Sequence, residues 1–247
     1  MIGFFRKMRQ RLLNENKVTR YAAYALGEIL LVVIGILIAL NINNWNEAKR
    51  DRIIEQSYLL NLREDLEADI KWIKRYVNDR YDAKLSALNK GKAYYQGNYV
   101  IGDTLSFLNE LGYGSVFGNI VWAFKKTTYD ELVNTGNFRK IQNDSLRQAV
   151  LDYYWLINRT YESTADDQTG YITFINSRAP FDRNNPERIE LFDQQLLLKS
   201  IKSEEYYRLV NLEITLARRI FGFGNGIIEQ AQGLIDLIDE EMKKTRK

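Results

Sequence analysis

The chain has 247 residues, with 35 lysines and arginines against 32 aspartates and glutamates and a formal charge of +3. It contains neither cysteine nor histidine, which excludes disulfides, thiolate metal sites, thiol nucleophiles and histidine general bases. The carboxylates show no calcium-loop spacing, so we expect no metal site, no cofactor and no enzymatic activity. With 27% charged and 45% hydrophobic residues, the composition is typical of a folded protein.

The basic charge is concentrated in residues 1–20, which hold six lysines and arginines against the single acid Glu15. Phe5, Leu12 and Leu13 lie among them. This mixture is typical of an amphipathic helix on an anionic membrane surface, and equally of a basic tail that only sets membrane orientation. Under either interpretation the charge is directed at lipid, so we expect no nucleic-acid partner.

An apolar segment follows at residues 21–42, with a single charge at Glu28. At about 1.5 Å per residue, a helix of this length crosses a hydrocarbon layer of about 30 Å. Six basic residues precede the segment and three follow it closely, so the positive-inside rule places the N-terminus in the cytoplasm. The sequence therefore predicts an uncleaved signal anchor in a bacterial inner membrane, with residues 1–20 cytoplasmic and residues 43–247 forming a periplasmic helical domain.

The span carries two features suited to contact with another membrane helix. Small residues recur at spacings of four and eight near one face, where a second backbone can approach closely. A carboxylate costs about 2.5 to 3.5 kcal/mol in hydrocarbon, so Glu28 either contacts a partner or extends to the cytoplasmic headgroups. The predicted helix contacts are Ala23, Gly27, Glu28, Gly35 and Ala39, and the predicted membrane-interface residues are Arg20, Tyr21 and Trp45.

Residues 36–90 contain neither glycine nor proline, which favours one helix that continues out of the membrane. The polar cluster at residues 41–47 is the expected position of a break. Beyond it, apolar residues recur every three or four positions over residues 59–88, and again over residues 209–238 in a helix beginning at Ser203. Two stripes of the same period predict an all-α fold in which two long helices pack antiparallel in an extracytoplasmic bundle.

Two segments between the long helices are expected to be irregular. Residues 91–126 are dense in glycine and aromatic side chains, which predicts a connector with a short helix near residues 104–111 capped by Asp103. The aromatics either close the end of the bundle or line a ligand groove. Residues 166–192 contain both prolines and form the second irregular region.

Between these regions, Thr128 and Glu131 form a capping-box pattern that begins a short helix. Gly136 is placed to end this helix, and Asn143 or Asp144 is placed to cap the next one. This stretch also holds the residues that we predict as a partner or ligand surface, although surface charge and helix capping explain the arginines more simply. They are Tyr129, Arg139 and Arg147.

Several segments resemble a family of uncharacterised bacterial single-pass inner-membrane proteins. They are the opening Phe4-Phe5-Arg6-Lys7, the span from Gly27-Glu28-Ile29 onward, and the sequence Asn43-Asn44-Trp45-Asn46-Glu47 that follows it. A second block near residues 125–155 includes Thr128-Tyr129-Asp130-Glu131-Leu132 and Thr135-Gly136-Asn137-Phe138. The resemblance implies one N-terminal span and a helical domain outside the inner membrane. It implies no activity, because the family has none to transfer.

Two classes of function remain. The first is a membrane-anchored structural or interaction protein, an oligomeric or accessory subunit of a bacterial envelope complex. Its partners would be the lipid bilayer and either a second copy of this chain or another membrane protein. The second is a sensor module that binds a small ligand in the connector at residues 91–126. A sensor needs a cytoplasmic part that responds to its signal, and here only the short tail, residues 1–20, is expected in the cytoplasm. This favours the first class.

Overall fold

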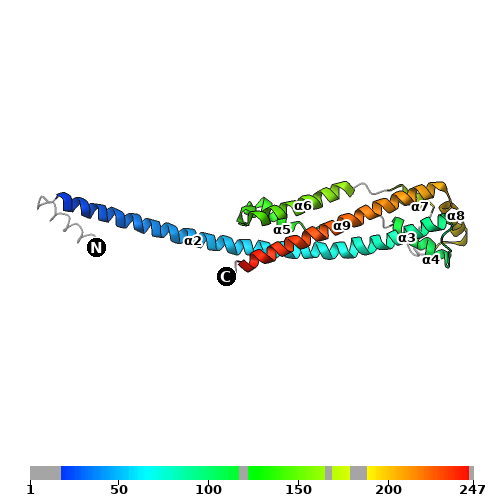
Figure 1. The fold of residues 1–247 in the computed structure, drawn as a ribbon, viewed down its shortest axis with the longest axis horizontal. Coiled ribbons are helices and arrows are strands. Elements are labelled where there is room, and N and C mark those ends of the chain that lie inside the picture. The colour runs from blue at the N-terminus through cyan, green and yellow to red at the C-terminus, as the bar shows by residue number, and fades with distance from the viewer. Residues whose placement is uncertain (1–17, 117–121, 165–168, 179–187, 245–247) are drawn as a thin grey trace. The chain divides into compact units, whose positions relative to one another are not determined.

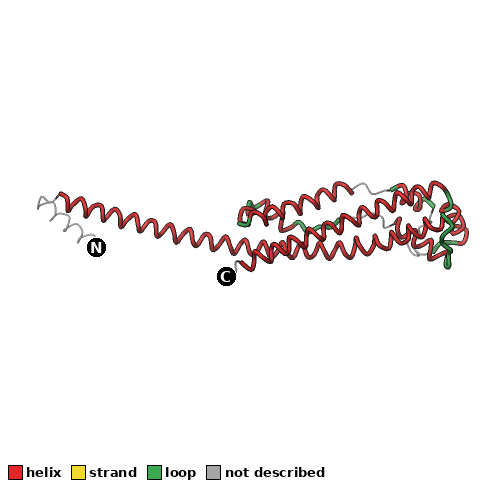
Figure 2. The backbone as a smooth tube through the Cα atoms, in the orientation of Figure 1, coloured by secondary structure: helices red, strands yellow, loops and turns green. Residues whose placement is uncertain are grey.

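The computed structural model describes residues 18–116, 122–164, 169–178 and 188–244 (Figure 1). All regular secondary structure in these ranges is helical, which confirms the predicted all-α class (Figure 2). The predicted tail at residues 1–20 falls almost entirely outside the described residues. In chain order the elements are α2 (Val18–Ile73), the π-helical turn η1 (Lys74–Asn78), α3 (Asp79–Tyr95), α4 (Thr104–Val116), α5 (Thr127–Asn134), the 3-10 turn η2 (Asn137–Lys140), α6 (Asp144–Thr164), α7 (Gly170–Asn176), α8 (Leu191–Ile201) and α9 (Glu204–Lys244).

Contacts divide the chain into two units, the first ending at Glu55 and the second beginning at Gln56. In the first unit, α2 is long and apolar enough to cross a membrane near the N-terminus, and none of its apolar stretch is buried. Leu31, for example, is 73% exposed. The helix also continues through residues 41–47 without the expected break. Asparagine disfavours a helix by less than about 1 kcal/mol per residue, which is too little to interrupt a helix of this length.

In the second unit, α9 packs along η1 and α3. Two ion pairs give the register, with Arg63 Nε 2.9 Å from Asp239 Oδ1 and Lys84 Nζ 2.5 Å from Glu213 Oε1. Arg63 in α2 comes before Lys84 in α3, whereas their partners in α9 come in the reverse order. α9 therefore runs in the opposite direction to α2 and α3 (Figure 1). α6 also packs on α9. Buried side chains along these helices include Leu62, Leu66, Ile73, Val150, Ile157, Ile227 and Ile238.

At the π-helical turn η1, α9 presents the glycine Gly224 to the helix it packs against. A Cβ on Gly224 would stand 3.1 Å from Ile73 Cγ2 and 3.2 Å from Val77 Cγ1, tighter than most real Cβ contacts. Glycine therefore lets the two backbones come together at this point. Asn78 and Asn225 form a hydrogen bond across the same contact, with 3.0 Å between Nδ2 and Oδ1.

The apolar stripe predicted for α9 is correct mainly in its second half. In that half, the buried residues of the stripe are Ile220, Ile227, Ala231, Leu234 and Ile238. In the first half, Leu212 is 54% exposed, whereas the adjacent Glu213 is only 1% exposed. Ala217 is buried in place of its larger neighbour Leu216, which is half-buried. The prediction counted large apolar residues as core, but here the Lys84–Glu213 ion pair and the small residue Ala217 are buried instead.

Three short helices, α4, α7 and α8, close one end of the second unit, where they contact α3 and α9 (Figure 1). Asp103 caps α4 as predicted, because its Oδ1 accepts from the Ser106 N–H at 2.9 Å. Aromatic rings of the connector pack on one another, with Tyr94 and Tyr99 centroids 5.4 and 5.6 Å from that of Phe107. This packing corresponds to the bundle-closing interpretation of the aromatics.

Two expectations about irregular segments are wrong. The region at residues 166–192 contains the helix α7, whose first turn is capped by Thr169, with Oγ1 3.2 Å from the Ile172 nitrogen. α3 also runs through Gly91 instead of ending there. This glycine is needed for packing rather than for a turn, because the Tyr206 side chain occupies the space where a Cβ would be.

Gly91→Ala should destabilise the protein by about 2 kcal/mol, because overpacking a closed core outweighs the helix propensity of alanine. A Cβ there would stand 2.0 Å from the Tyr206 hydroxyl oxygen and 2.8 Å from Leu111 Cδ2. Gly222→Ala is the matched control, because its position in α9 faces open space and the change should stabilise by up to about 1 kcal/mol. Urea unfolding of both variants in mild detergent measures the difference. Equal stabilities would contradict the close packing at Gly91.

Candidate functional site

One face of α2 carries polar side chains that hold the segment between α4 and α6. Tyr58, Asp65 and Asp69 are spaced by seven and four residues, which places them on the same side of the helix. We call these three residues and their hydrogen-bond partners the polar seam. The partners are Lys125, Thr128, Glu131, Asn137 and Tyr153.

Asp69 is the most buried acid of the polar seam, at 1% exposure. Its Oδ1 accepts from the backbone N–H of Lys125 and its Oδ2 from the Tyr153 hydroxyl, both at 2.8 Å. Loss of hydration outweighs these hydrogen bonds and raises the pKa of Asp69 to about 6. Burial and the nearby Asp69 charge raise the pKa of Tyr153 far above its usual range, so its hydroxyl stays a donor. Asp69 therefore ties α2 to α6 and to the segment that enters α5.

The remaining contacts of the polar seam join α2 to α5 and η2. Asp65 Oδ2 accepts from Thr128 Oγ1 at 2.6 Å, and the Tyr58 hydroxyl donates to Glu131 Oε1 at 2.9 Å. Asn137 Nδ2 donates to the Tyr58 hydroxyl at 3.0 Å. The predicted capping box is therefore wrong, because Thr128 and Glu131 bond to side chains of α2 instead of the local backbone. The capping box is a local pattern, and here hydrogen-bond partners from a distant helix replace the local ones.

The three residues predicted as a partner or ligand surface have different environments. Tyr129 stacks on Tyr154, with ring centroids 4.0 Å apart. Arg147 Nη1 donates to the Ile141 carbonyl oxygen at 2.6 Å and its Nη2 pairs with an aspartate of the same turn, which is a capping role. Arg139 exposes its side chain to solvent. Packing thus accounts for Tyr129, and helix capping accounts for Arg147.

In the first unit, residues predicted to contact another helix lie on an uncovered surface. Among the described residues, no heavy atom outside the local helix backbone and the chain neighbours lies within 4 Å of the Cβ position of Gly27 or Gly35. Glu28 is exposed on the same helix. Trp45 is 65% exposed, with Lys49 Nζ 5.7 Å from its ring centroid. Ala39 is also exposed, and the side chains of Arg20, Tyr21 and Ala23 lie outside the described residues.

Asp69 should make the stability of the protein depend on pH. The pKa of Asp69 is about 6 in the folded protein and 3.8 ordinarily. The stability that the protonated Asp69 contributes is therefore complete below pH 3.8 and is lost as the pH rises through 6. At 1.36 kcal/mol per pKa unit, the loss is at most about 3 kcal/mol. Asp69→Asn removes the titration and keeps an oxygen to accept from Lys125. Unfolding both proteins in detergent from about pH 4 to about pH 7 should show the wild type losing stability relative to the variant. A constant difference would contradict the raised pKa.

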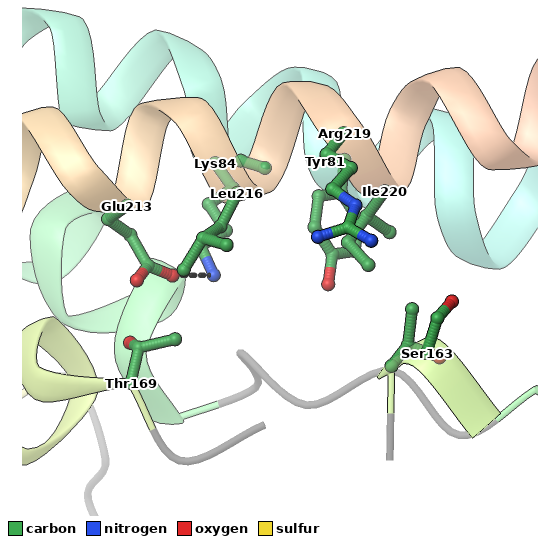
Figure 3. Close-up of a pocket in the computed structure, with 10 residues that line it drawn as sticks. Tyr81, Lys84, Ser163, Thr169, Glu213, Leu216, Arg219 and Ile220 are labelled. Carbon is green, nitrogen blue, oxygen red and sulfur yellow. Dashed lines mark ion pairs between the residues drawn. The ribbon is translucent and has the colours of Figure 1, made fainter. Parts of the chain in front are cut away.

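A cavity of about 100 Å³ lies between α3, α9, the end of α6 and the start of α7 (Figure 3). At its inner end, the ion-paired side chains of Lys84 and Glu213 are 7% and 2% exposed. The second carboxylate oxygen, Glu213 Oε2, is buried and has no hydrogen-bond partner among the described residues. Ser163 and Arg219 also line the cavity and are exposed, so it opens to solvent.

Sequence reasoning missed this cavity, because a charged residue in a helix is usually exposed. One local signal was present. Glu213 falls in step with Tyr206, Val210, Ala217 and Ile220, at alternating spacings of four and three residues. A stripe drawn through these positions places the glutamate on the buried face of α9, where the structure has it.

Comparisons with known proteins place the chain in a family without assigning it a role. Searches among curated proteins and among solved structures each found no match. One family model, described as a family of unknown function (DUF6090), matches residues 28–176, which is more than half of the chain. The matched residues include the whole polar seam, whereas Glu213 and Arg219 lie outside them. The chain therefore belongs to DUF6090, a family of unknown function.

Proposed function

We propose that this protein is a membrane-anchored structural or interaction protein, an oligomeric or accessory subunit of a bacterial envelope complex, and not an enzyme. The observation that carries the proposal is the uncovered apolar surface of α2. From Leu26 to Ile42, its large hydrophobic side chains are 46% to 73% exposed. Exposure of so long an apolar surface to water is unfavourable, whereas the hydrocarbon core of a bilayer can surround it.

The proposed topology is single-pass in the inner membrane. Residues 1–20 would lie in the cytoplasm, residues 21–42 in the bilayer, and residues 43–247 in the periplasm as an antiparallel bundle. The excess of basic residues before the span supports this orientation. The chain has no cysteine, so Lys7→Cys and Lys247→Cys each give one labelling position. A maleimide that cannot cross the inner membrane should label only Lys247→Cys in intact cells. Labelling of Lys7→Cys before lysis would overturn the topology.

The span itself supplies the proposed partner contact. In the part of the chain that the structure describes, no side chain covers the backbone at Gly27 or Gly35, so a second helix can approach closely at this face. Glu28 adds a carboxylate whose cost in hydrocarbon, about 2.5 to 3.5 kcal/mol, a donor or cation on a partner helix would offset. The partner would be a second copy of this chain or another membrane protein.

The test of the function compares two glutamates of the same helix. The wild type, extracted in mild detergent, should purify with a second copy or a companion protein, measured by light scattering and mass spectrometry. Glu28→Leu should lose most of that species, whereas the matched control Glu47→Leu, outside the predicted span, should keep it. A wild type that migrates as a single chain would refute the proposal. So would a Glu28→Leu variant that retains the partner.

A further inference from the structure

The cavity beside the Lys84–Glu213 ion pair has the chemistry of a small-molecule site. We propose that it binds a short hydroxy-carboxylate, whose hydroxyl group donates to Glu213 Oε2 and whose carboxylate pairs with Arg219. This site goes beyond the proposed membrane-anchoring function, which needs no ligand. Figure 3 shows the Glu213 carboxylate and the Arg219 guanidinium facing the same space from one helix, α9.

Glu213 defines what the inner end of the cavity accepts. Its Oε1 is 2.5 Å from Lys84 Nζ, whereas Oε2 is buried without a hydrogen-bond partner among the described residues. Buried carboxylate oxygens are normally hydrogen-bonded, so a donor placed at Oε2 gains free energy. Lys84 already supplies the counter-charge, and a second ammonium group beside it would be repelled. The inner group of the ligand is therefore a neutral donor, such as a hydroxyl.

The outer end of the cavity accepts an anion. Arg219 is exposed at the opening, and its guanidinium carbon lies 5.2 Å from the Phe223 ring centroid. A guanidinium presents paired N–H donors that match a carboxylate. Among the described residues that line the cavity, Lys84 and Arg219 face the single acid Glu213, which gives these side chains a net charge of +1. A monoanion neutralises this charge, whereas a dianion or a zwitterion does not.

The size of the cavity limits the ligand to a few heavy atoms. A volume of about 100 Å³ exceeds the roughly 15 Å³ that a single water needs by the same kind of measure. Six positions separate Glu213 from Arg219, a rise of about 9 Å along the helix. The volume therefore admits a skeleton of only a few carbons. Leu216, Ala217 and Ile220 supply an apolar wall for it.

The test uses the full-length protein in detergent and isothermal titration with four small molecules. Glycolate and lactate carry both a hydroxyl and a carboxylate, acetate lacks the hydroxyl, and ethylene glycol lacks the carboxylate. We expect saturable binding of glycolate or lactate, with acetate and ethylene glycol at least tenfold weaker. Equal binding of acetate would overturn the role of Glu213. Absence of saturation with glycolate and lactate would show that the cavity serves only packing and hydration.

Two neighbouring arginines provide the matched variants. Arg219→Gln should weaken glycolate binding at least tenfold, whereas Arg218→Gln, also exposed on α9 but outside the cavity lining, should leave it unchanged. Equal effects of the two changes would reduce the binding to general surface charge and refute the site. Glu213→Gln keeps an oxygen for Lys84 and turns a donor group toward the ligand. It should therefore remove the preference for glycolate over acetate, and an unchanged preference would contradict the proposal.

Discussion

Lys84→Met should destabilise the protein by about 3 to 5 kcal/mol, because it leaves the Glu213 carboxylate buried without its counter-charge. The cost arises mainly from the unpaired charge and much less from the lost attraction. Replacing both partners should therefore restore stability, and Lys84→Met with Glu213→Leu should come within about 2 kcal/mol of the wild type or exceed it. Urea unfolding of the two single variants and the double variant measures the coupling between them.

A second ion pair of the chain serves as the control for this cycle. Lys90 Nζ and Glu110 Oε2 are 2.6 Å apart, but their side chains are 36% and 41% exposed. Water screens this pair, so Lys90→Met should destabilise the protein far less than Lys84→Met does. Similar losses for Lys84→Met and Lys90→Met would show that burial does not determine the energetics of these pairs. Additive single changes at Lys84 and Glu213 would show that the two side chains are not coupled.

The parts of the fold that follow from local pattern could be predicted from the sequence. The apolar period over residues 59–88 correctly marks buried positions such as Leu62, Leu66 and Ile73. Asp103 and Asn143 both cap the helices expected of them, and Asn143 Oδ1 lies 3.2 Å from the Leu146 nitrogen. These features depend on residues within one or two helical turns, which is the range over which sequence patterns are informative.

The candidate site could not be predicted in the same way, because it depends on pairs of residues far apart in the chain. Asp69 and Lys84 are charged residues of a type that usually lies at the surface of a helix, yet both are buried. Asp69 is matched by Tyr153 on α6 and Lys84 by Glu213 on α9. Neither match is visible until the helices are placed against each other. The capping-box prediction at Thr128 failed for the same reason, because its bonding partner Asp65 comes from α2.

Asp69→Ala should destabilise the protein by about 2 to 4 kcal/mol in mildly acidic solution, because it removes the acceptor of two donors. The Tyr153 hydroxyl would remain buried without its acceptor, and so would the backbone N–H of Lys125. Glu64→Ala is the control, since its side chain is exposed on the same helix and its loss should change stability by less than about 0.5 kcal/mol. Near neutral pH the effect of Asp69→Ala should shrink, because the wild type itself is weakened as the Asp69 pKa of about 6 is passed.

A double-mutant cycle separates a hydrogen-bond network from independent contacts. Tyr153→Phe removes one donor and leaves Asp69 bonded to Lys125, so it should cost about 1 kcal/mol. Combined with Asp69→Ala it should cost less than the sum, because the phenylalanine leaves no hydroxyl to lose its acceptor. Additive losses would show that Asp69 and Tyr153 act separately. A combined loss smaller than the sum would show that the hydrogen bond between Asp69 of α2 and Tyr153 of α6 contributes to stability as one interaction.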